Sequence, residues 1–261
     1  MEVEFTRRME RQFAELQGRH GRKKSDYCVC EGVRCCSELL ASPAAENAVL
    51  AVKSEKLRSP LPGLEKIPTA SLSDEKLQKL SGTVTSQGII ILVKRPSVDP
   101  DFFPAASDPF ILAVDKLGDP GNFGTILRTA RAAGLHEFWY TAGSADPYSP
   151  KVVRSALAAQ FSMTLREFPD LAALTDFAAH QGFGKIFLTD PHTGESCFEC
   201  AELFSKSVVV IGSEAHGIGA EAAGCRVTIP MPGNFESLNA AQAATIVLFE
   251  HVRRITLIGK N

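Results

Sequence analysis

The stretch PFILAVDKLGDPGNFGTILRTARAAG, residues 109–134, decides the fold class of the chain. Its first half contains ILAV, an apolar run typical of a buried strand. Three glycines at a spacing of three follow, at Gly118, Gly121 and Gly124, and a helical pattern begins directly after them. A strand that passes through a glycine-rich loop into a helix is the repeating unit of parallel α/β sheets. The same arrangement also holds phosphate groups in many proteins, so this stretch raises a question of ligand as well as of fold.

The same alternation continues to the end of the chain. Further strands are expected in EFWYTA, MTLREF, KIFLT, SVVVIG and VTIPM, and further helices in SPKVVRSALAAQ, DLAALTDFAAHQ and LNAAQAATIVLFEHVRR. This pattern predicts a mostly parallel sheet covered by helices on both faces. Ligands of such sheets bind at the carboxyl ends of the strands. The loops expected to form a site are therefore 115–124, 141–150, 189–195, 212–219 and 230–238.

A proline-rich segment divides the chain. RPSVDPDFFPAASDPF, residues 95–110, contains four prolines and has no periodicity, which is typical of a linker. Before it, helices are expected in FTRRMERQFAEL, VRCCSELLAS and SDEKLQKL, and strands in YCVCEG, NAVLAV and GIIILV. We therefore expect a small α/β domain at 1–96, a linker at 97–108 and a second domain at 109–261.

Composition and charge are those of an ordinary globular protein, with 44% hydrophobic and 22% charged residues. No apolar run approaches the ~18 residues that a membrane span needs, and the first residues lack a secretory signal. A cytoplasmic location without a membrane partner is expected. The net charge of −2 gives no general support for nucleic-acid binding, although basic residues crowd the first 24 positions.

The seven cysteines form two groups, CVCEGVRCC at 28–36 and CFEC at 197–200, with Cys225 apart from them. An odd number of cysteines in a chain of this size argues against a disulfide framework. Neither group is followed by a second pair at zinc-finger spacing. Free thiols and no metal are expected, with a structural zinc as the alternative.

A dinucleotide site is one alternative for the loop after ILAV. A Rossmann fingerprint has the form GxGxxG with an acidic residue about 20 positions on, and a Walker loop ends in Gly-Lys-Ser/Thr. The chain has GxxGxxG instead, and the next expected strand ends in Tyr140 and Thr141. A nicotinamide-dependent oxidoreductase is therefore disfavoured. Arg128 lies one turn inside the expected helix. An arginine there can bind a phosphate or carboxylate with two hydrogen bonds.

Two further loops are unusual. IGSEAHGIG, residues 211–219, sets Glu214 between glycines that let the backbone approach a ligand. IPMPGNFESLNAAQAA, residues 229–244, places Ser237 as the expected N-cap of the last helix. Each loop alone is as consistent with an ordinary turn or cap. Because all three unusual loops follow the carboxyl ends of strands, together they indicate a binding site.

Together these loops resemble the motifs of the SpoU family of RNA ribose methyltransferases, in the SPOUT class. The matching residues are Asn122-Phe-Gly124 with Arg128, Gly212-Ser-Glu214 with Gly217, and Ile229-Pro-Met231 with Ser237-Leu238-Asn239, with a weaker match of KVVRS and its Arg154. The resemblance covers about 109–261, and residues 1–96 more weakly resemble the RNA substrate-binding module that often precedes it. It implies a knotted α/β catalytic domain with a mostly parallel sheet threaded into a trefoil knot. It also implies a preceding ribosomal-protein-L30e-like α/β domain, and a homodimer.

The resemblance further implies methyl transfer from S-adenosylmethionine to a ribose 2′-hydroxyl, and the RNA-binding-like module favours ribosomal RNA. By the family pattern, the residues that hold the donor are Gly212, Ile229 and Leu238, with Thr189 and Met231 close by. Because arginine stays protonated, we expect Arg128 to clamp the RNA phosphate and stabilise the developing alkoxide. The residues expected to orient Arg128 and the ribose are Asn122, Glu214, Ser237 and Asn239.

Three alanines depart from the family pattern. Ala156 and Ala158 stand where a serine and a glycine are common, and Ala241 stands where a serine is common. These changes leave the target nucleotide open. Two alternatives follow: a transfer-RNA target, and an RNA-binding or assembly factor without catalysis, against which the intact Asn122 and Arg128 argue.

Overall fold

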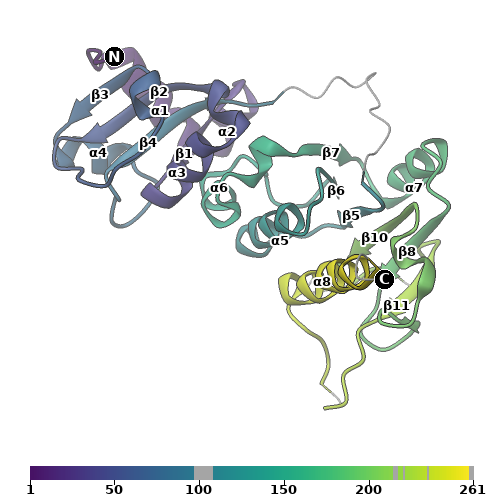
Figure 1. Cartoon of the computed structure of the whole chain (residues 1–261). Helices are drawn as coiled ribbons and strands as arrows, with labels where there is room; N and C mark the ends of the chain where they lie inside the picture. The colour runs from purple at the N-terminus through teal and green to yellow at the C-terminus, as the bar shows by residue number, and fades with distance from the viewer. Residues whose placement is uncertain (97–107, 214–216, 220, 234, 259–261) are drawn as a thin grey trace. The chain divides into compact units, whose positions relative to one another are not determined.

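The computed structural model describes residues 1–96, 108–213, 217–219, 221–233 and 235–258 (Figure 1). The chain forms two compact units, of which the first consists of Met1–Ser97 and Asp146–Ser162 and the second of Val98–Ala145 and Met163–Asn261. The segment 146–162, which the sequence places inside the second domain, thus packs with the first unit. Within the described part of the chain, no helix is long and apolar enough to cross a membrane.

The first unit is built on a four-stranded sheet. Its strands lie in the order β1 (Tyr27–Glu31), β4 (Ile89–Lys94), β2 (Ala48–Ser54) and β3 (Thr69–Leu72). β4 is antiparallel to both of its neighbours, and β2 and β3 are parallel. The helices of this unit are α1 (Arg7–Gln17), α2 (Arg19–Lys23), α3 (Val33–Ala41), α4 (Asp74–Leu80) and α6 (Pro150–Ala156), with short 3₁₀ turns at Pro43–Asn47, Leu64–Lys66 and Ala159–Ser162.

Strand β4 explains how this sheet is covered on both faces. Its sequence IIILVK is apolar at nearly every position because both faces are buried. Ile89, Ile91 and Val93 pack into the cluster that includes the cysteines of β1 and α3. Ile90 and Leu92 point the other way, into the cluster that includes residues of α1 and α4.

Contacts distant in sequence hold α6 in the first unit. Arg154 Nη1 donates to Glu31 Oε2 at 3.1 Å, and Glu31 is buried. Arg22 Nε donates to Asp146 Oδ2 at 2.8 Å. The Cys35 thiol donates to the carbonyl of Val153 at 3.3 Å. These bonds explain why the segment 146–162 packs with the first unit.

Six of the seven cysteines are buried core residues, and Cys225 is exposed. All seven are free, and those of β1 and α3 are buried, where burial raises the pKa of the Cys28 thiol well above its usual value. In the ranges described above, no group of three or more His, Cys, Asp or Glu side chains is placed to hold a metal ion.

The second unit is built on a seven-stranded parallel sheet, which confirms the predicted fold class. The strand order is β7 (Thr164–Phe168), β6 (Glu137–Thr141), β5 (Ile111–Val114), β10 (Ser207–Ile211), β8 (Lys185–Thr189), β11 (Cys225–Thr228) and β9 (Glu195–Ser196). Its helices are α5 (Pro120–Ala132), α7 (Leu171–His180) and α8 (Ala240–Ile258), with a 3₁₀ turn at Ala201–Phe204.

Alternate side chains of β6 show how the helices cover this sheet. Trp139 packs against Phe177 of α7, with ring centroids 5.3 Å apart. Phe138 points to the other face, where its ring lies 5.6 Å from that of Phe123 in α5. Helices α5 and α8 pack against each other (Figure 1). Helices therefore cover both faces, as the alternation of strands and helices predicts.

Helices α5 and α8, which adjoin the loops expected to form the site, do not begin at the predicted residues. α5 begins at Pro120 because Asp119 is its N-cap and accepts from the Asn122 N–H at 2.7 Å. Gly121 and Gly124 are therefore helical, and the expectation of a glycine-rich loop through Gly124 is wrong. α8 begins at Ala240, and Asn239 rather than Ser237 caps it.

Candidate active site

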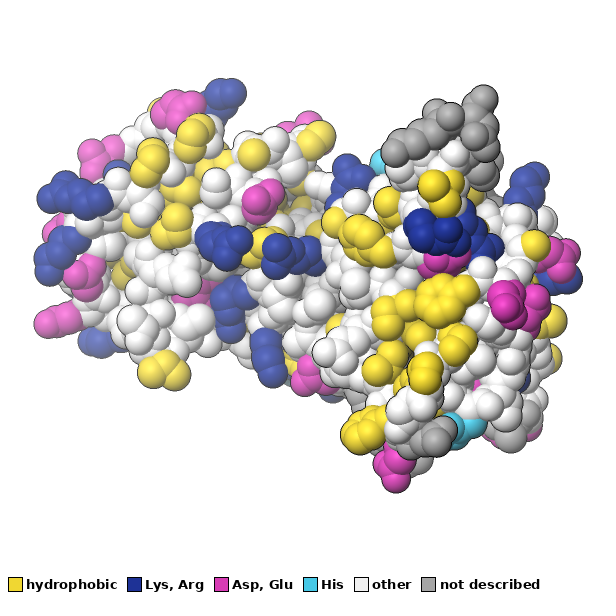
Figure 2. Space-filling model, turned by 60° about the horizontal axis from the view of Figure 1, so that its bottom comes forward, with side chains coloured by type: hydrophobic (Ala, Val, Ile, Leu, Met, Phe, Trp, Pro, Cys, Tyr) yellow, Lys and Arg dark blue, Asp and Glu magenta, His cyan; other side chains and the backbone are white. Residues whose placement is uncertain are grey.

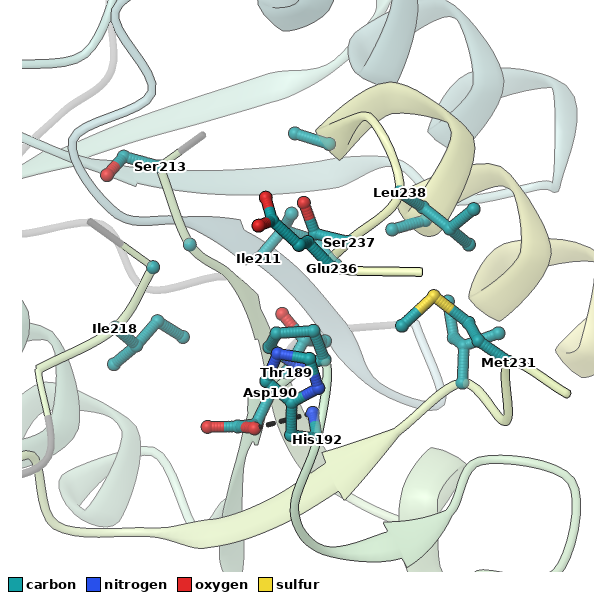
Figure 3. Close-up of a pocket in the computed structure, with 16 residues that line it drawn as sticks. Thr189, Asp190, His192, Ile211, Ser213, Ile218, Met231, Glu236, Ser237 and Leu238 are labelled. Carbon is teal, nitrogen blue, oxygen red and sulfur yellow. Dashed lines mark hydrogen bonds between the residues drawn. The ribbon is translucent and has the colours of Figure 1, made fainter. Parts of the chain in front are cut away.

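A cavity of about 400 Å³ lies at the carboxyl ends of β8 and β10 (Figure 3). Its walls come from four segments that follow β8, β10 and β11 and that open α8. The lining residues are Thr189, Asp190, Pro191, His192, Ile211, Gly212, Ser213, Gly217, Ile218, Ile229, Met231, Glu236, Ser237, Leu238, Ala240 and Ala243. Cavities that hold small molecules commonly measure about 300–1,000 Å³ and have mostly apolar walls.

The structure brings the expected donor-binding residues together. The five residues, which come from all four of these segments, line this cavity: Thr189, Gly212, Ile229, Met231 and Leu238. Ser237, expected among the catalytic residues, lines it as well. In Figure 3, Met231 and Leu238 lie on one side of the cavity and Ser213 and Ile218 on the other, with Glu236 and Ser237 between them.

The loop after β10 closes on itself beside the cavity. The Gly217 N–H donates to the Ser213 carbonyl at 2.9 Å, and Gly217 has a left-handed backbone with φ of +59°. A Cβ atom at Gly212 would come within 2.7 Å of the Gly217 carbonyl carbon. Only glycine at position 212 therefore allows the two arms of the loop to approach this closely. Glu214, expected to act at this loop, lies outside the described residues.

The end of β8 carries a fixed carboxylate. Thr189 Oγ1 donates to the Val210 carbonyl at 3.0 Å, which ties β8 to β10. Asp190 Oδ1 accepts from the backbone N–H groups of His192 and Thr193, each at 2.9 Å. Burial opposes ionisation of Asp190, but these hydrogen bonds outweigh it and hold the pKa of the carboxyl below its usual value. Asp190 is therefore ionised at neutral pH, and its Oδ2 lies 3.9 Å from Arg226 Nη1.

A hydrogen bond joins the beginnings of α5 and α8. Asn239 Oδ1 accepts from the Ala241 N–H at 2.9 Å, which fixes the orientation of the Asn239 amide. Its Nδ2 then donates to Asn122 Oδ1 at 3.1 Å. Asn239 lies between Leu238 and Ala240, which line the cavity. Two of the expected catalytic residues are therefore in direct contact at its rim.

Arg128 is not part of the cavity wall. Because α5 begins at Pro120, Arg128 is its ninth residue and lies about 12 Å along the helix from its start. The expectation that it stands one turn inside the helix is wrong, and its side chain is exposed. The residues expected to bind the donor line the cavity, whereas the exposed Arg128 does not.

The three departures from the family pattern have different surroundings. Ala241 is buried in the first turn of α8. Ala156 and Ala158 belong to the first unit, and Ala158 has a left-handed backbone with φ of +64°. Glycine adopts this conformation without the steric penalty that alanine incurs, which explains why a glycine suits that position.

Eight cavity residues were not singled out from the sequence: Asp190, Pro191, His192, Ile211, Ile218, Glu236, Ala240 and Ala243. Asp190 and His192 lie in the expected loop 189–195, and Glu236 in the expected loop 230–238. Position at a strand's carboxyl end is the signal that could identify Asp190 and His192, whereas Ile211 and Glu236 lie within the quoted stretches 211–219 and 229–244.

Comparisons with known proteins agree with this geometry. A model of the SpoU rRNA Methylase family matches residues 109–249, and a model of the MRM3-like substrate binding domain matches residues 11–91. An uncharacterized tRNA/rRNA methyltransferase of Synechocystis is 30% identical, over 94% of this chain and 90% of that protein. A 23S rRNA (guanosine(2553)-2′-O)-methyltransferase of Bacillus subtilis is 29% identical, over 92% of this chain and 93% of that protein.

A solved structure is similar as well. The SpoU methyltransferase AviRb from Streptomyces viridochromogenes, in complex with the cofactor AdoMet, has a TM-score of 0.79 and 26% sequence identity. The match covers 97% of this chain and 99% of that one.

A parallel sheet with a ligand-sized cavity at the carboxyl ends of its strands defines a class of α/β enzymes that bind small molecules there. Within that class, the chain belongs to the SpoU rRNA methylase family. This confirms the family and the enzyme class predicted from the three loops, and it removes the oxidoreductase alternative.

Proposed function

We propose that this chain transfers a methyl group from S-adenosylmethionine to a ribose 2′-hydroxyl of ribosomal RNA. One observation carries the proposal: the five residues that the motifs assign to the donor, far apart in sequence, line one cavity of about 400 Å³. Relatives named as ribosomal RNA 2′-O-methyltransferases support the substrate.

The cavity fits the donor chemically. Apolar side chains of Ile211, Ile229 and Leu238 suit the adenine ring and the methylene chain. Gly212 lines the cavity and has no side chain, so the donor can approach its backbone closely. When bound, the donor supplies a methyl group on a positively charged sulfur. The ionised Asp190 on the wall complements that positive charge.

The substrate side is formed by α5 and the start of α8. A ribose 2′-hydroxyl is a poor acid, so the negative charge that develops on its oxygen needs a nearby cation or hydrogen-bond donor. We assign the cation to Arg128, whose exposed side chain is accessible to the RNA. Asn122, Asn239 and Ser237 orient the ribose at the rim. The role of Glu214 stays a prediction from the sequence.

The domain division is part of the proposal. The substrate-binding domain is assigned to 1–96, the linker to 97–108 and the methyltransferase domain to 109–261, of which 146–162 pack with the first unit. Exposed basic residues of α1 and α2, among them Arg7, Arg11 and Lys23, support an RNA-binding role for the first domain.

The chain is further proposed to form a homodimer through α8. Three large hydrophobic side chains of this helix are half exposed: Phe249 (48%), Ile255 (51%) and Leu257 (51%). Figure 2 shows hydrophobic side chains gathered on the second unit. A second copy of the chain, packed on this face, would bury these hydrophobic side chains. We expect a dimer in sedimentation experiments and a monomer after Phe249→Arg. The control Val84→Arg, at an exposed valine of the first unit, is expected to stay dimeric.

A trefoil knot is proposed for the second unit. The strand order supports it, because β10 lies between β5 and β8 although it follows both in sequence. After β11 the chain returns to the cavity and ends in α8, which packs against α5. We also propose a cytoplasmic location, since seven free cysteines are typical of a reducing compartment.

The function is tested by mass spectrometry of RNA from cells with and without the gene. We expect loss of one ribose methyl group from ribosomal RNA. Loss from transfer RNA instead would support the transfer-RNA alternative. No lost methyl group, together with no donor binding by the pure protein in calorimetry, would support the assembly factor without catalysis.

A further inference from the structure

Hydrogen bonds join the loop after β5 to the loop after β6, at the carboxyl end of the seven-stranded sheet. These two joined loops are called the platform below. The Lys116 N–H donates to Thr141 Oγ1 at 2.9 Å, and the Leu117 N–H donates to Ser144 Oγ at 3.1 Å. Thr141 Oγ1 in turn donates to Asp115 Oδ1 at 2.6 Å, and both residues are buried. The loop after β5 is therefore fixed to the loop after β6 by hydrogen bonds on either side of Lys116.

The platform holds Lys116 in an unusual conformation. Its φ is +50°, in the left-handed region that residues with a side chain avoid. Such conformations persist where the surroundings over-determine them, and they concentrate at functional sites. Beside it, Gly143 has φ of +94°, and a Cβ there would lie 3.5 Å from Lys116 Cγ. Position 143 thus lies in van der Waals reach of the lysine side chain.

Lys116 stands next to the donor cavity. The preceding residue, Asp115, donates its N–H to the Ile211 carbonyl at 2.9 Å, and Ile211 lines the cavity. The strands β5 and β10 that carry these residues are neighbours, about 4.8 Å apart. The same loop leads into α5, whose first turn carries Asn122. Lys116 is exposed, and among the described residues no carboxylate forms an ion pair with its ammonium group.

We propose that Lys116 binds a phosphodiester of the RNA substrate beside the target ribose, in a backbone conformation preset by the Asp115–Thr141 hydrogen bond. The inference rests on the proposed function. A lysine ammonium binds phosphate as a compact point charge, and a preset conformation lowers the entropy lost on binding. This explains why a strained lysine, rather than a glycine, occupies the position.

The same sheet offers a matched control. Lys206 is also exposed and has φ of +45°. It precedes β10, at the amino end of the sheet, where its N–H donates to the Pro109 carbonyl at 2.8 Å. The two lysines thus share residue type, exposure and backbone conformation but lie at opposite ends of the sheet.

The test uses the full chain and ribosomal RNA from cells that lack the gene. Lys116→Gly and Lys116→Gln are expected to raise the KM for this RNA roughly tenfold, more than they lower kcat. Both are expected to reduce the slope of log affinity against log salt concentration by about one. Lys206→Gly is expected to change neither quantity. Lys116→Gly and Lys206→Gly are expected to unfold at the wild-type temperature or above it, because glycine relieves the strain.

Wild-type KM and salt slope in both Lys116 variants would overturn the proposal. An equal rise in KM and an equal fall in the salt slope in Lys206→Gly would overturn it as well. Those changes would then follow from backbone strain or from general charge. RNA binding and its salt slope are measured without methyl transfer. Failure of the Lys116 assignment is therefore distinguishable from failure of the proposed function, which shows as no methyl transfer by the wild-type chain.

Discussion

The two ends of the seven-stranded sheet use similar polar residues in opposite ways. At the amino end, Asp108 accepts from the backbone N–H groups of His136 and Glu137, at 2.6 and 2.9 Å. At the carboxyl end, Asp190, Glu236 and Ser237 line a cavity of about 400 Å³. Asp108 is buried with its backbone partners, whereas Asp190, which also accepts from backbone N–H groups, lines a space large enough for a ligand.

Helix α8 connects the two ends and shows what the difference means. Its first residues, Ala240 and Ala243, are small and line the cavity. Further along, the ring of His251 packs between Phe110 and Phe204, with centroids 5.0 and 5.2 Å away. The amino end is thus closed by packing and internal hydrogen bonds, and changes there are expected to affect stability. Changes at the carboxyl end are expected to affect ligands and catalysis.

Replacement of Arg128 by alanine tests the carboxyl end with the largest expected effect. The variant loses the cation assigned to the RNA phosphate and the developing alkoxide, so methyl transfer is expected to fall by about 10³-fold. Donor affinity is expected to stay at the wild-type value because Arg128 does not line the cavity. Transfer rates and donor calorimetry measure the two effects. Arg131→Ala, nearer the end of the same helix, is the control, and full activity of Arg128→Ala would remove Arg128 from the mechanism.

Glu250→Gln tests the amino end. Glu250 is buried, and hydrogen bonds from Arg253 outweigh burial, with Arg254 adding to them, to lower the pKa of its carboxyl to about 2. Loss of the charge leaves two cations without their partner, so we expect a loss of about 3 kcal/mol in the free energy of unfolding. Urea denaturation at neutral pH measures it.

The pH dependence of unfolding sharpens this prediction. Because the folded pKa of Glu250 lies below its ordinary 4.5, its contribution is present above pH 4.5 and is lost as the pH falls toward about 2. The Glu250→Gln variant is therefore expected to lose less stability than the wild type as the pH falls over this range. Glu202→Gln, in the exposed ion pair with Lys185, is the control and should cost less than about 1 kcal/mol. Equal costs for the two variants would contradict the contrast between the two ends.

Gly212→Ala has a smaller expected effect and tests the cavity wall. The added Cβ would meet the Gly217 carbonyl carbon at 2.7 Å, so the loop must open. We expect donor affinity to fall about thirtyfold, or about 2 kcal/mol, in calorimetry. Gly184→Ala is the control, since a Cβ there meets no atom of the described residues within 4 Å. Unchanged donor affinity in Gly212→Ala would argue against this cavity as the donor site.

Two substitutions of Asn239 separate its roles and have the smallest expected effect on stability. Asn239→Ala removes the cap of α8 and is expected to cost about 1 kcal/mol. Asn239→Asp keeps the cap, since aspartate caps equally well, but loses the hydrogen bond to Asn122. Thermal unfolding should therefore distinguish the variants, while methyl transfer should fall in both. Normal activity of Asn239→Asp would show that the contact with Asn122 is dispensable.

The elements that the sequence predicts well are those whose signal is local. Strands β5 and β10 are continuous apolar runs because both faces of a parallel sheet are buried. β3 was missed because its sequence, TASL, has no apolar run. The start of α5 was misplaced because its glycines obscured the Asp119–Pro120 signal of a helix N-terminus. The packing of 146–162 with the first unit depends on pairs such as Arg154 and Glu31, 123 positions apart, which leave no local pattern.

The same limit applies to the candidate site. The resemblance to the SpoU family implied Gly212, Ile229 and Leu238 as donor-binding residues, and the fold brings them to one cavity. Asp190 and Ile211 line it because β8 and β10 are neighbours, and that pairing is visible only in the strand order. The left-handed backbone of Lys116 depends on hydrogen bonds to another loop, so no single-sequence pattern predicts it.

Alkaline digestion of RNA labelled by the pure protein tests the central claim most directly. Unmodified ribosomal RNA is incubated with the chain and with S-adenosylmethionine labelled in its methyl group. A 2′-O-methyl group removes the hydroxyl that attacks the neighbouring phosphodiester in alkali, so the modified linkage survives in a dinucleotide. We predict that the label is recovered in alkali-stable dinucleotides. Label in mononucleotides, which would indicate methylation of a base, or no label in the RNA would contradict the assignment.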